Sequence, residues 1–256
     1  MSAAKQTWYM TMRHVMALWR QPWWIAVTLV QPVIWLLLYG ALFKRVVDIP
    51  GFHGGSYIAF LAPGVVMMTA VFSAGWGGMS MIQDIDRGII DRFLATPVKR
   101  SSLIVGSVGQ AALTIAIQSL IIVGLALLVG AGFANGVLGV IGMIAIGMLL
   151  GLTVGALSNG LALVVRKEET LIGAINVLLF PLTFISTAFM PKDLIPEWMQ
   201  TAAAVNPVNW AVEAARIAAS GDDWGKLAGY TGALIALSLV CIAFATRAFR
   251  AYQSSL

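Results

Sequence analysis

This 256-residue chain has few charged residues and almost no cysteine. Only 11% of its residues are Asp, Glu, Lys or Arg, whereas 59% are hydrophobic and the mean hydropathy is +0.88. Soluble domains carry about 25% charged residues because their surface faces water, so this composition excludes an ordinary soluble fold. The single cysteine, Cys241, excludes an intrachain disulfide, and its position in an apolar run fits packing better than a reactive thiol.

Several chemical signatures are missing as well. The chain has no Gly-x-x-x-x-Gly-Lys-Ser/Thr phosphate loop, so it does not hydrolyse ATP in the usual way by itself. His14 and His53 are isolated, and no metal-ligand or nucleophile–base pattern is visible. No basic helix with base-reading residues is present either. We therefore expect no catalytic residue, metal site or cofactor in this chain, and no nucleic-acid partner.

What the chain does contain is a series of long apolar runs. About 20 apolar residues of helix cross a bilayer, and the runs contain no Asp, Glu, Lys, Arg or His. We predict an all-α polytopic membrane protein, a single domain over residues 1–256, with six transmembrane helices. The predicted spans are 23–43, 57–82, 103–131, 136–165, 171–189 and 227–244. Glycines in the fourth run predict close helix packing: Gly142, Gly147, Gly151 and Gly155.

The basic residues divide unevenly between the two sides that six spans create. Eleven of the 16 Lys and Arg fall on the side that holds both termini. Because loops rich in Lys and Arg stay in the cytoplasm, we predict that both termini are cytoplasmic. The net charge of +5 then reflects topology.

The segment before the first run predicts an amphipathic helix. Residues 1–22 are not a cleavable signal, whose apolar region would precede a small-residue cleavage site. On a helical wheel a stripe roughly 100° wide contains Trp8, Met12, Val15, Met16 and Trp19. Such a helix fits the plane of the membrane interface, and a partly ordered tail is the alternative.

The cytoplasmic segment 83–97 is short, charged and amphipathic. Apolar residues recur every four positions, so one helical face holds Ile85, Ile89 and Phe93. Pro97 ends the helix close to its position. We predict a rigid helical knob between the second and third spans, although by pattern alone a solvated loop fits equally well.

The outer segment 190–226 is apolar enough to dip into the membrane but too broken to span it. Its tryptophans, Trp198, Trp210 and Trp224, suit the lipid–water interface. We predict two short helices that enter and leave on one side, with a peripheral loop as the alternative. Glu213 and Arg216 are three residues apart and can pair, either to shape an outer gate or as a structural anchor.

Three segments together resemble the membrane subunit of the ABC-2 type exporter family, above all its drug-resistance and polysaccharide-export permeases. The first is Trp19-Arg20-Gln21-Pro22 with Gln31-Pro32, at the entry to the first span. The second resembles the family's coupling helix: Asp84, Ile85, Asp86, Arg87, Gly88, Ile89, Asp91, Phe93, Leu94, Thr96 and Pro97. The third resembles its external re-entrant signature: Pro196, Trp198, Asn206, Pro207, Glu213 and Arg216. In the second segment aspartates stand where the family favours glutamates, which changes the reach of the acids.

The resemblance implies a half-transporter in the bacterial inner membrane. It implies a second permease copy, as a homodimer, and two copies of a cytoplasmic ATPase subunit that binds ATP and Mg. The coupling helix would be the ATPase docking site. The expected function is export of a hydrophobic or amphipathic molecule, a drug or lipid, with a lipid-linked glycan as the alternative. A substrate path could include Trp35, Tyr39, Phe72, Trp76 and Phe180, although packing or lipid contact explains each of them too.

An ion-coupled secondary transporter is a rival class. Proton relays use ionisable groups inside the membrane, and the six runs contain none. Uncharged polar residues in the runs could coordinate an ion, but they are better explained by hydrogen bonds between helices: Gln31, Gln110, Gln118, Asn159 and Asn176.

Overall fold

The computed structural model describes residues 22–48, 56–88 and 100–253, and within these ranges the regular elements are all helices. The first half of the chain forms α2 (Pro22–Leu42), η1 (Lys44–Asp48), α3 (Tyr57–Gly75), α4 (Gly77–Asp86) and α6 (Arg100–Leu128). The second half forms α7 (Gly136–Val165), α8 (Glu168–Phe184), η2 (Lys192–Leu194), α9 (Glu197–Ala204), α10 (Pro207–Ser220) and α11 (Trp224–Gln253). The predicted interfacial helix lies outside the described residues, apart from Pro22.

Four of the predicted spans are long apolar helices in the structure. Within the described residues, four helices are long and apolar enough to cross a membrane: Tyr57–Asp86, Ala111–Leu128, Gly136–Val165 and Trp224–Tyr252. The predicted limits 136–165 match α7. The first predicted span corresponds to α2, a 21-residue helix that contains Pro32.

The fifth predicted span was too long. We expected it to reach residue 189, but α8 ends at Phe184 after 17 residues, about 26 Å at 1.5 Å per residue. The helix ends because side chains of α10 bind the backbone that would continue it. Asn206 donates to the carbonyls of Leu182 and Ile185, and the amide of Thr187 donates to Asn209.

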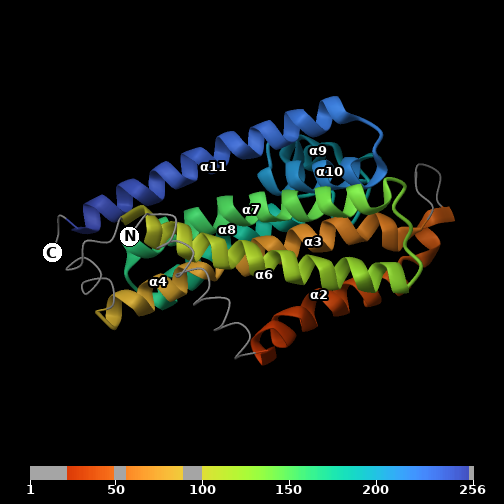
Figure 1. The fold of residues 1–256 in the computed structure, drawn as a ribbon. Coiled ribbons are helices and arrows are strands. Elements are labelled where there is room, and N and C mark those ends of the chain that lie inside the picture. The colour runs from red at the N-terminus through yellow and green to blue at the C-terminus, as the bar shows by residue number, and fades with distance from the viewer. Residues whose placement is uncertain (1–21, 49–55, 89–99, 254–256) are drawn as a thin grey trace.

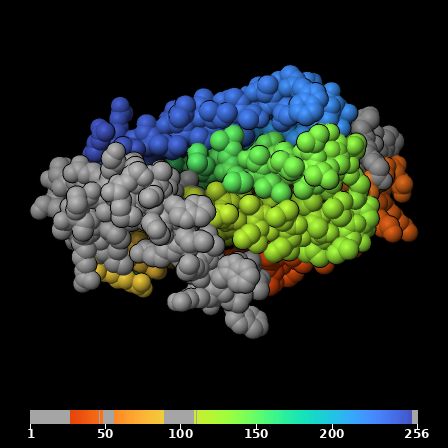
Figure 2. Space-filling model, viewed as in Figure 1, coloured from red at the N-terminus to blue at the C-terminus, as the bar shows by residue number. Residues whose placement is uncertain are grey.

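α7 lies at the centre of the bundle and packs against α3, α6, α10 and α11 (Figure 1). From outside, α6 and α7 run side by side and α11 covers one flank (Figure 2). The predicted close packing of the α7 glycines is confirmed. A Cβ added to Gly142 would lie 2.9 Å from Ala218 Cβ, and one added to Gly147 would lie 3.3 Å from Met67 Cε.

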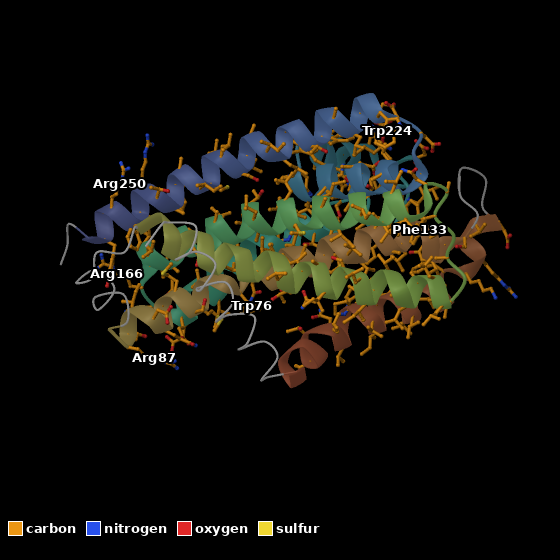
Figure 3. All side chains as sticks on the ribbon, in the orientation of Figure 1. Trp76, Arg87, Phe133, Arg166, Trp224 and Arg250 are labelled. Carbon is orange, nitrogen blue, oxygen red and sulfur yellow. The ribbon has the colours of Figure 1, made fainter. Side chains whose placement is uncertain are left out.

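The two ends of the bundle differ in charge and content. Arg87, Arg166 and Arg250 lie at one end, which we call the basic end, and Trp224 and Phe133 lie at the other (Figure 3). The helices α9 and α10 lie in the half that holds Trp224 (Figure 1), which we call the α10 end. The predicted grouping of basic residues at positions 87, 166 and 250 is therefore confirmed.

Two predicted continuous helices are interrupted. The second span breaks at Trp76, where Met79 N–H donates to the Trp76 carbonyl three residues back instead of four. The helix predicted from residue 83 to 95 is not continuous either, because α4 ends at Asp86 and Gly88 has a φ of 62°. Glycine adopts this left-handed conformation without steric cost, and such a conformation does not continue an α-helix.

Candidate functional site

A polar stripe runs along α10 in an otherwise apolar helix. Asn206, Asn209, Glu213 and Arg216 follow one another at spacings of three and four, so they share one face. The opposite faces are filled with small buried residues such as Ala211. Because alanines let neighbouring helices approach closely, α10 packs tightly against α7 and α11 while its polar face meets the chain that follows α8.

Arg216 is at the centre of a clamp that holds residues 187–188. Its Nη1 donates to Glu213 Oε1 and to Thr187 Oγ1, each at 3.1 Å. Its Nη2 donates to the carbonyls of Thr187 and Ala188. The guanidinium also stacks on Phe60, with Cζ 3.7 Å from the ring centroid. The Glu213–Arg216 pair expected from their spacing is therefore confirmed.

Thr187 and Asn209 complete the clamp. Asn209 Oδ1 accepts from the Thr187 amide at 2.9 Å and lies 2.8 Å from its hydroxyl, which also contacts Glu213. Sequence reasoning missed both residues. The three- and four-residue spacing from Asn206 to Arg216 was a signal that could have identified Asn209, whereas nothing local marks Thr187.

Asparagines hold both ends of α10. Asn206 Oδ1 accepts from Val208 N–H at 2.9 Å, the usual N-cap interaction, and Pro207 takes the first helical position, where no amide hydrogen is needed. At the other end, Asn135 donates its side-chain and backbone N–H groups to the carbonyls of Ala218 and Ala219. The predicted residues Asn206 and Pro207 thus position α10.

The other two predicted outer-gate residues lie at the start of α9 and make none of the clamp hydrogen bonds given above. Pro196 is the N-cap of α9, and Trp198 is 63% exposed. The structure therefore joins Asn206, Glu213 and Arg216 around one segment and leaves Trp198 on the surface.

Aromatic rings connect the clamp to the middle of the bundle. Phe72, Phe180 and Phe184 follow one another at centroid distances of 5.3 and 6.2 Å. From Phe184, neighbouring rings 5.5 to 6.1 Å apart lead to the Arg216 cation: Phe189, Tyr39, Phe43, Tyr57 and Phe60. Such distances are typical of favourable aromatic pairs.

A cavity of about 130 Å³ lies between α2, α3 and α6. Three of the predicted path residues line it: Trp35, Phe72 and Trp76. Tyr39 stacks on Trp35 at 4.7 Å, and Phe180 contacts Phe72, so both support the cavity wall without lining it. Polar residues also line the cavity: Thr28, Gln31, Thr69, Ser73 and Gln118. The expectation that Gln118 bonds across helices is confirmed, because its Nε2 donates to Thr28 Oγ1 at 3.0 Å.

The break at Trp76 connects this cavity to the predicted coupling segment. Ser158 of α7 holds the break, since its hydroxyl donates to the Gly75 carbonyl and accepts from Gly78 N–H at 3.1 Å. A Cβ on Gly78 would lie 2.6 Å from the Ser158 carbonyl oxygen, so glycine is required for this approach. α4 then runs ten residues to Asp86.

Five of the predicted coupling residues lie within the described chain. Asp84, Ile85 and Asp86 form the last turn of α4, and Arg87 and Gly88 follow it. Ile85 packs against the cluster of Phe249 and Tyr252 on α11, so its side chain is engaged within this chain. The other predicted coupling residues lie outside the described residues: Ile89, Asp91, Phe93, Leu94, Thr96 and Pro97.

The long apolar helices, the basic end and the short helices α9 and α10 are those of a polytopic helical membrane protein. The family model of the ABC-2 type transporter matches residues 5–219. The chain therefore belongs to the ABC-2 type transporter family, in agreement with the resemblance found in the sequence.

The relatives of this chain are permeases. It is 30% identical over 214 residues to the putative transport permease ycf38 of Pyropia yezoensis, an alignment that covers 83% of this chain and 73% of the relative. It is 30% identical over 207 residues to the daunorubicin resistance ABC transporter permease protein DrrB1 of Streptomyces coeruleorubidus, covering 80% and 71%. It is 25% identical over 248 residues to the inner membrane transport permease YadH of Escherichia coli K12, covering 93% of each chain.

Proposed function

We propose that this chain is the membrane subunit of an ATP-driven exporter of hydrophobic or amphipathic molecules. The observation that carries the proposal is the cavity between α2, α3 and α6, lined by Trp35, Phe72 and Trp76 and continued by aromatic rings toward Arg216. Its described lining contains no charged residue. Such a surface suits apolar and aromatic parts of a molecule better than a small ion. The name of the DrrB1 relative, a drug-resistance permease, agrees with this choice of substrate.

Energy for transport would come from a partner. In this proposal two cytoplasmic ATPase subunits bind ATP and Mg, and they dock at the segment that follows α4. α4, about 15 Å long, would then connect the docking segment at its C-terminal end to Trp76 at its N-terminal end, and Trp76 lines the cavity. Movement of the docking segment would reach the cavity at the glycine-rich break that Ser158 holds.

The orientation of the bundle follows from its charges. Because Lys and Arg collect on the cytoplasmic side, the basic end with Arg87, Arg166 and Arg250 would face the cytoplasm. α9 and α10 would then form the re-entrant pair on the outer side, and the Arg216 clamp would be part of an outer gate. α2 and α8 would complete six spans.

A second copy of the chain would complete the transport path. Sites for drug-sized ligands typically measure about 300–1,000 Å³, whereas this cavity measures about 130 Å³. One copy therefore holds only part of such a substrate. A homodimer, as expected from the family, would bring two cavities to one path in the inner membrane.

Reconstitution tests this proposal directly. The chain is placed in liposomes with and without its candidate ATPase, and efflux of a lipophilic dye is followed after ATP is added. We expect dye transport that needs both proteins and ATP, together with dye-stimulated ATP hydrolysis. Equal transport without the ATPase would instead identify a secondary carrier.

A further inference from the structure

Gln118 is an unusual member of the cavity wall because its carbonyl group has no hydrogen-bond partner among the described residues. The residue is 1% exposed, and its Nε2 is fixed by Thr28. Its Oε1 is buried and accepts no hydrogen bond in the described part of the chain. Leaving a buried acceptor unpaired is costly, so most such groups in proteins are satisfied. A ligand that donates a hydrogen bond to this oxygen would therefore remove that cost.

The remaining polar groups of the wall set the chemistry of that donor. Thr69 donates its hydroxyl hydrogen to the Val65 carbonyl at 2.8 Å, so toward the cavity it offers lone pairs only. Gln118 Oε1 is likewise an acceptor. The described lining contains no carboxylate to neutralise a cation. The wall therefore offers two acceptors here, while Gln31 and Ser73 can donate as well as accept. A neutral hydroxyl, which also does both, fits this wall better than an ammonium group.

The rest of the wall sets the shape of the ligand. The volume of about 130 Å³ is well below the roughly 300–1,000 Å³ of sites for drug-sized ligands, so the cavity takes a small molecule or one ring system of a larger one. Trp35, Phe72 and Trp76 offer ring faces for stacking. We propose that this cavity binds a neutral planar aromatic group bearing a hydroxyl, and that Gln118 selects the hydroxyl. The inference rests on the proposed function, since it names the ligand chemistry of that transport path.

The test compares two probes of the same shape, 2-naphthol and 2-methylnaphthalene. Binding to the purified full chain in lipid nanodiscs is measured without ATPase, and empty nanodiscs give the partition into lipid. We expect the protein to bind 2-naphthol about tenfold more tightly, because a site built to bond a hydroxyl rejects the analogue without it. Gln118→Met, which keeps the length but removes the acceptor, should abolish this preference and leave 2-methylnaphthalene binding unchanged.

Control variants separate recognition from packing. Ser119→Ala changes the next residue, which is equally buried, has no hydrogen-bond partner for its hydroxyl in the described ranges and does not line the cavity. It should leave the binding of both probes unaffected. Phe72→Ala should weaken both probes by a similar factor. Ser73→Leu fills the cavity while leaving the Gln118–Thr28 bond in place, and should prevent binding of both.

Two results would overturn the inference: a tenfold preference that survives Gln118→Met, or binding of both probes that survives Ser73→Leu. If Gln118→Met does not fold, as judged by thermal unfolding, the Ser73→Leu result decides alone. Failure of ATP-driven transport with intact, Gln118-dependent binding would contradict the proposed function but not this site. Transport by a protein that binds neither probe would contradict only this site.

Discussion

Regular helix is interrupted inside the bundle at the α10 end, where α8 stops, and at the α3–α4 break, where the span Tyr57–Asp86 bends at Trp76. Different groups hold the two places. At the α10 end, long polar side chains from Asn206 to Arg216 hold the end of α8 and the chain that follows it. At the break, one hydroxyl of Ser158 and the bare backbone of Gly75 and Gly78 make the contact. The first arrangement restrains the chain in several directions, and the second restrains it through a single side chain.

This difference suits opposite tasks. A network in which nearly every polar atom is satisfied is rigid and costly to open, as expected for a wall or a closed gate. A glycine contact with one bridging hydroxyl can shift with little loss, as expected for a joint. Two substitutions test the contrast and a third tests the docking segment beyond the joint, from the largest expected effect to the smallest.

Arg216→Gln should cause the largest loss of stability. It leaves the Glu213 carboxylate, 29% exposed, without its ion partner, and breaking such a pair costs about 3 kcal/mol. Lys226→Gln is the matched control: Lys226 and Asp223 are also three residues apart and 3.0 Å from each other, but the lysine side chain is 70% exposed. Exposed pairs of this kind contribute little to stability, because water screens them. Thermal unfolding in detergent measures both, and equal shifts would contradict the clamp.

Phe93→Ala should weaken association with the ATPase by about 2 kcal/mol, the scale of a buried interface anchor. Phe93 lies outside the described residues, and this prediction depends on the amphipathic pattern of residues 83–97. Arg92→Ala is the control, because rim charges mainly tune encounter rate. Copurification and dye-stimulated ATP hydrolysis are measured on both. Normal assembly and transport by Phe93→Ala would mean that the segment is only a solvated loop.

Gly78→Ala should stiffen or distort the joint at a cost of about 1–2 kcal/mol, since overpacking forces backbone shifts. The added methyl group would meet the Ser158 carbonyl oxygen at 2.6 Å, whereas a methyl group on the adjacent Gly77 would meet nothing within 4 Å. Gly77→Ala is therefore the control. We expect Gly78→Ala to hydrolyse ATP with reduced dye transport per ATP. If transport per ATP is the same in both variants, the break is not part of the transmission.

Sequence patterns were most reliable where the character of neighbouring residues decides the structure. The charge-free apolar run predicted the first and last residues of α7. The uneven distribution of Lys and Arg correctly placed Arg87, Arg166 and Arg250 at the same end of the bundle. The spacing of Glu213 and Arg216 correctly predicted their pair, because neighbours on one helix face are brought together by local geometry.

Partners far apart in the chain were not predictable in the same way. Thr187 is 29 residues from Arg216, and Ser158 is 80 residues from Gly78, so no local pattern connects them. The early end of α8 has the same origin, because Asn206 and Asn209 compete for the backbone that hydropathy alone would continue as helix.

The sequence by itself determined the class of this protein, its long apolar helices and the polar stripe of α10, because hydropathy and helical periodicity are properties of neighbouring residues. Only the tertiary structure decided which segment that stripe holds, where the second span bends, and that Gln118 faces a cavity with an unpaired carbonyl. These features depend on side chains meeting across helices, where burial makes each hydrogen bond costly to lose.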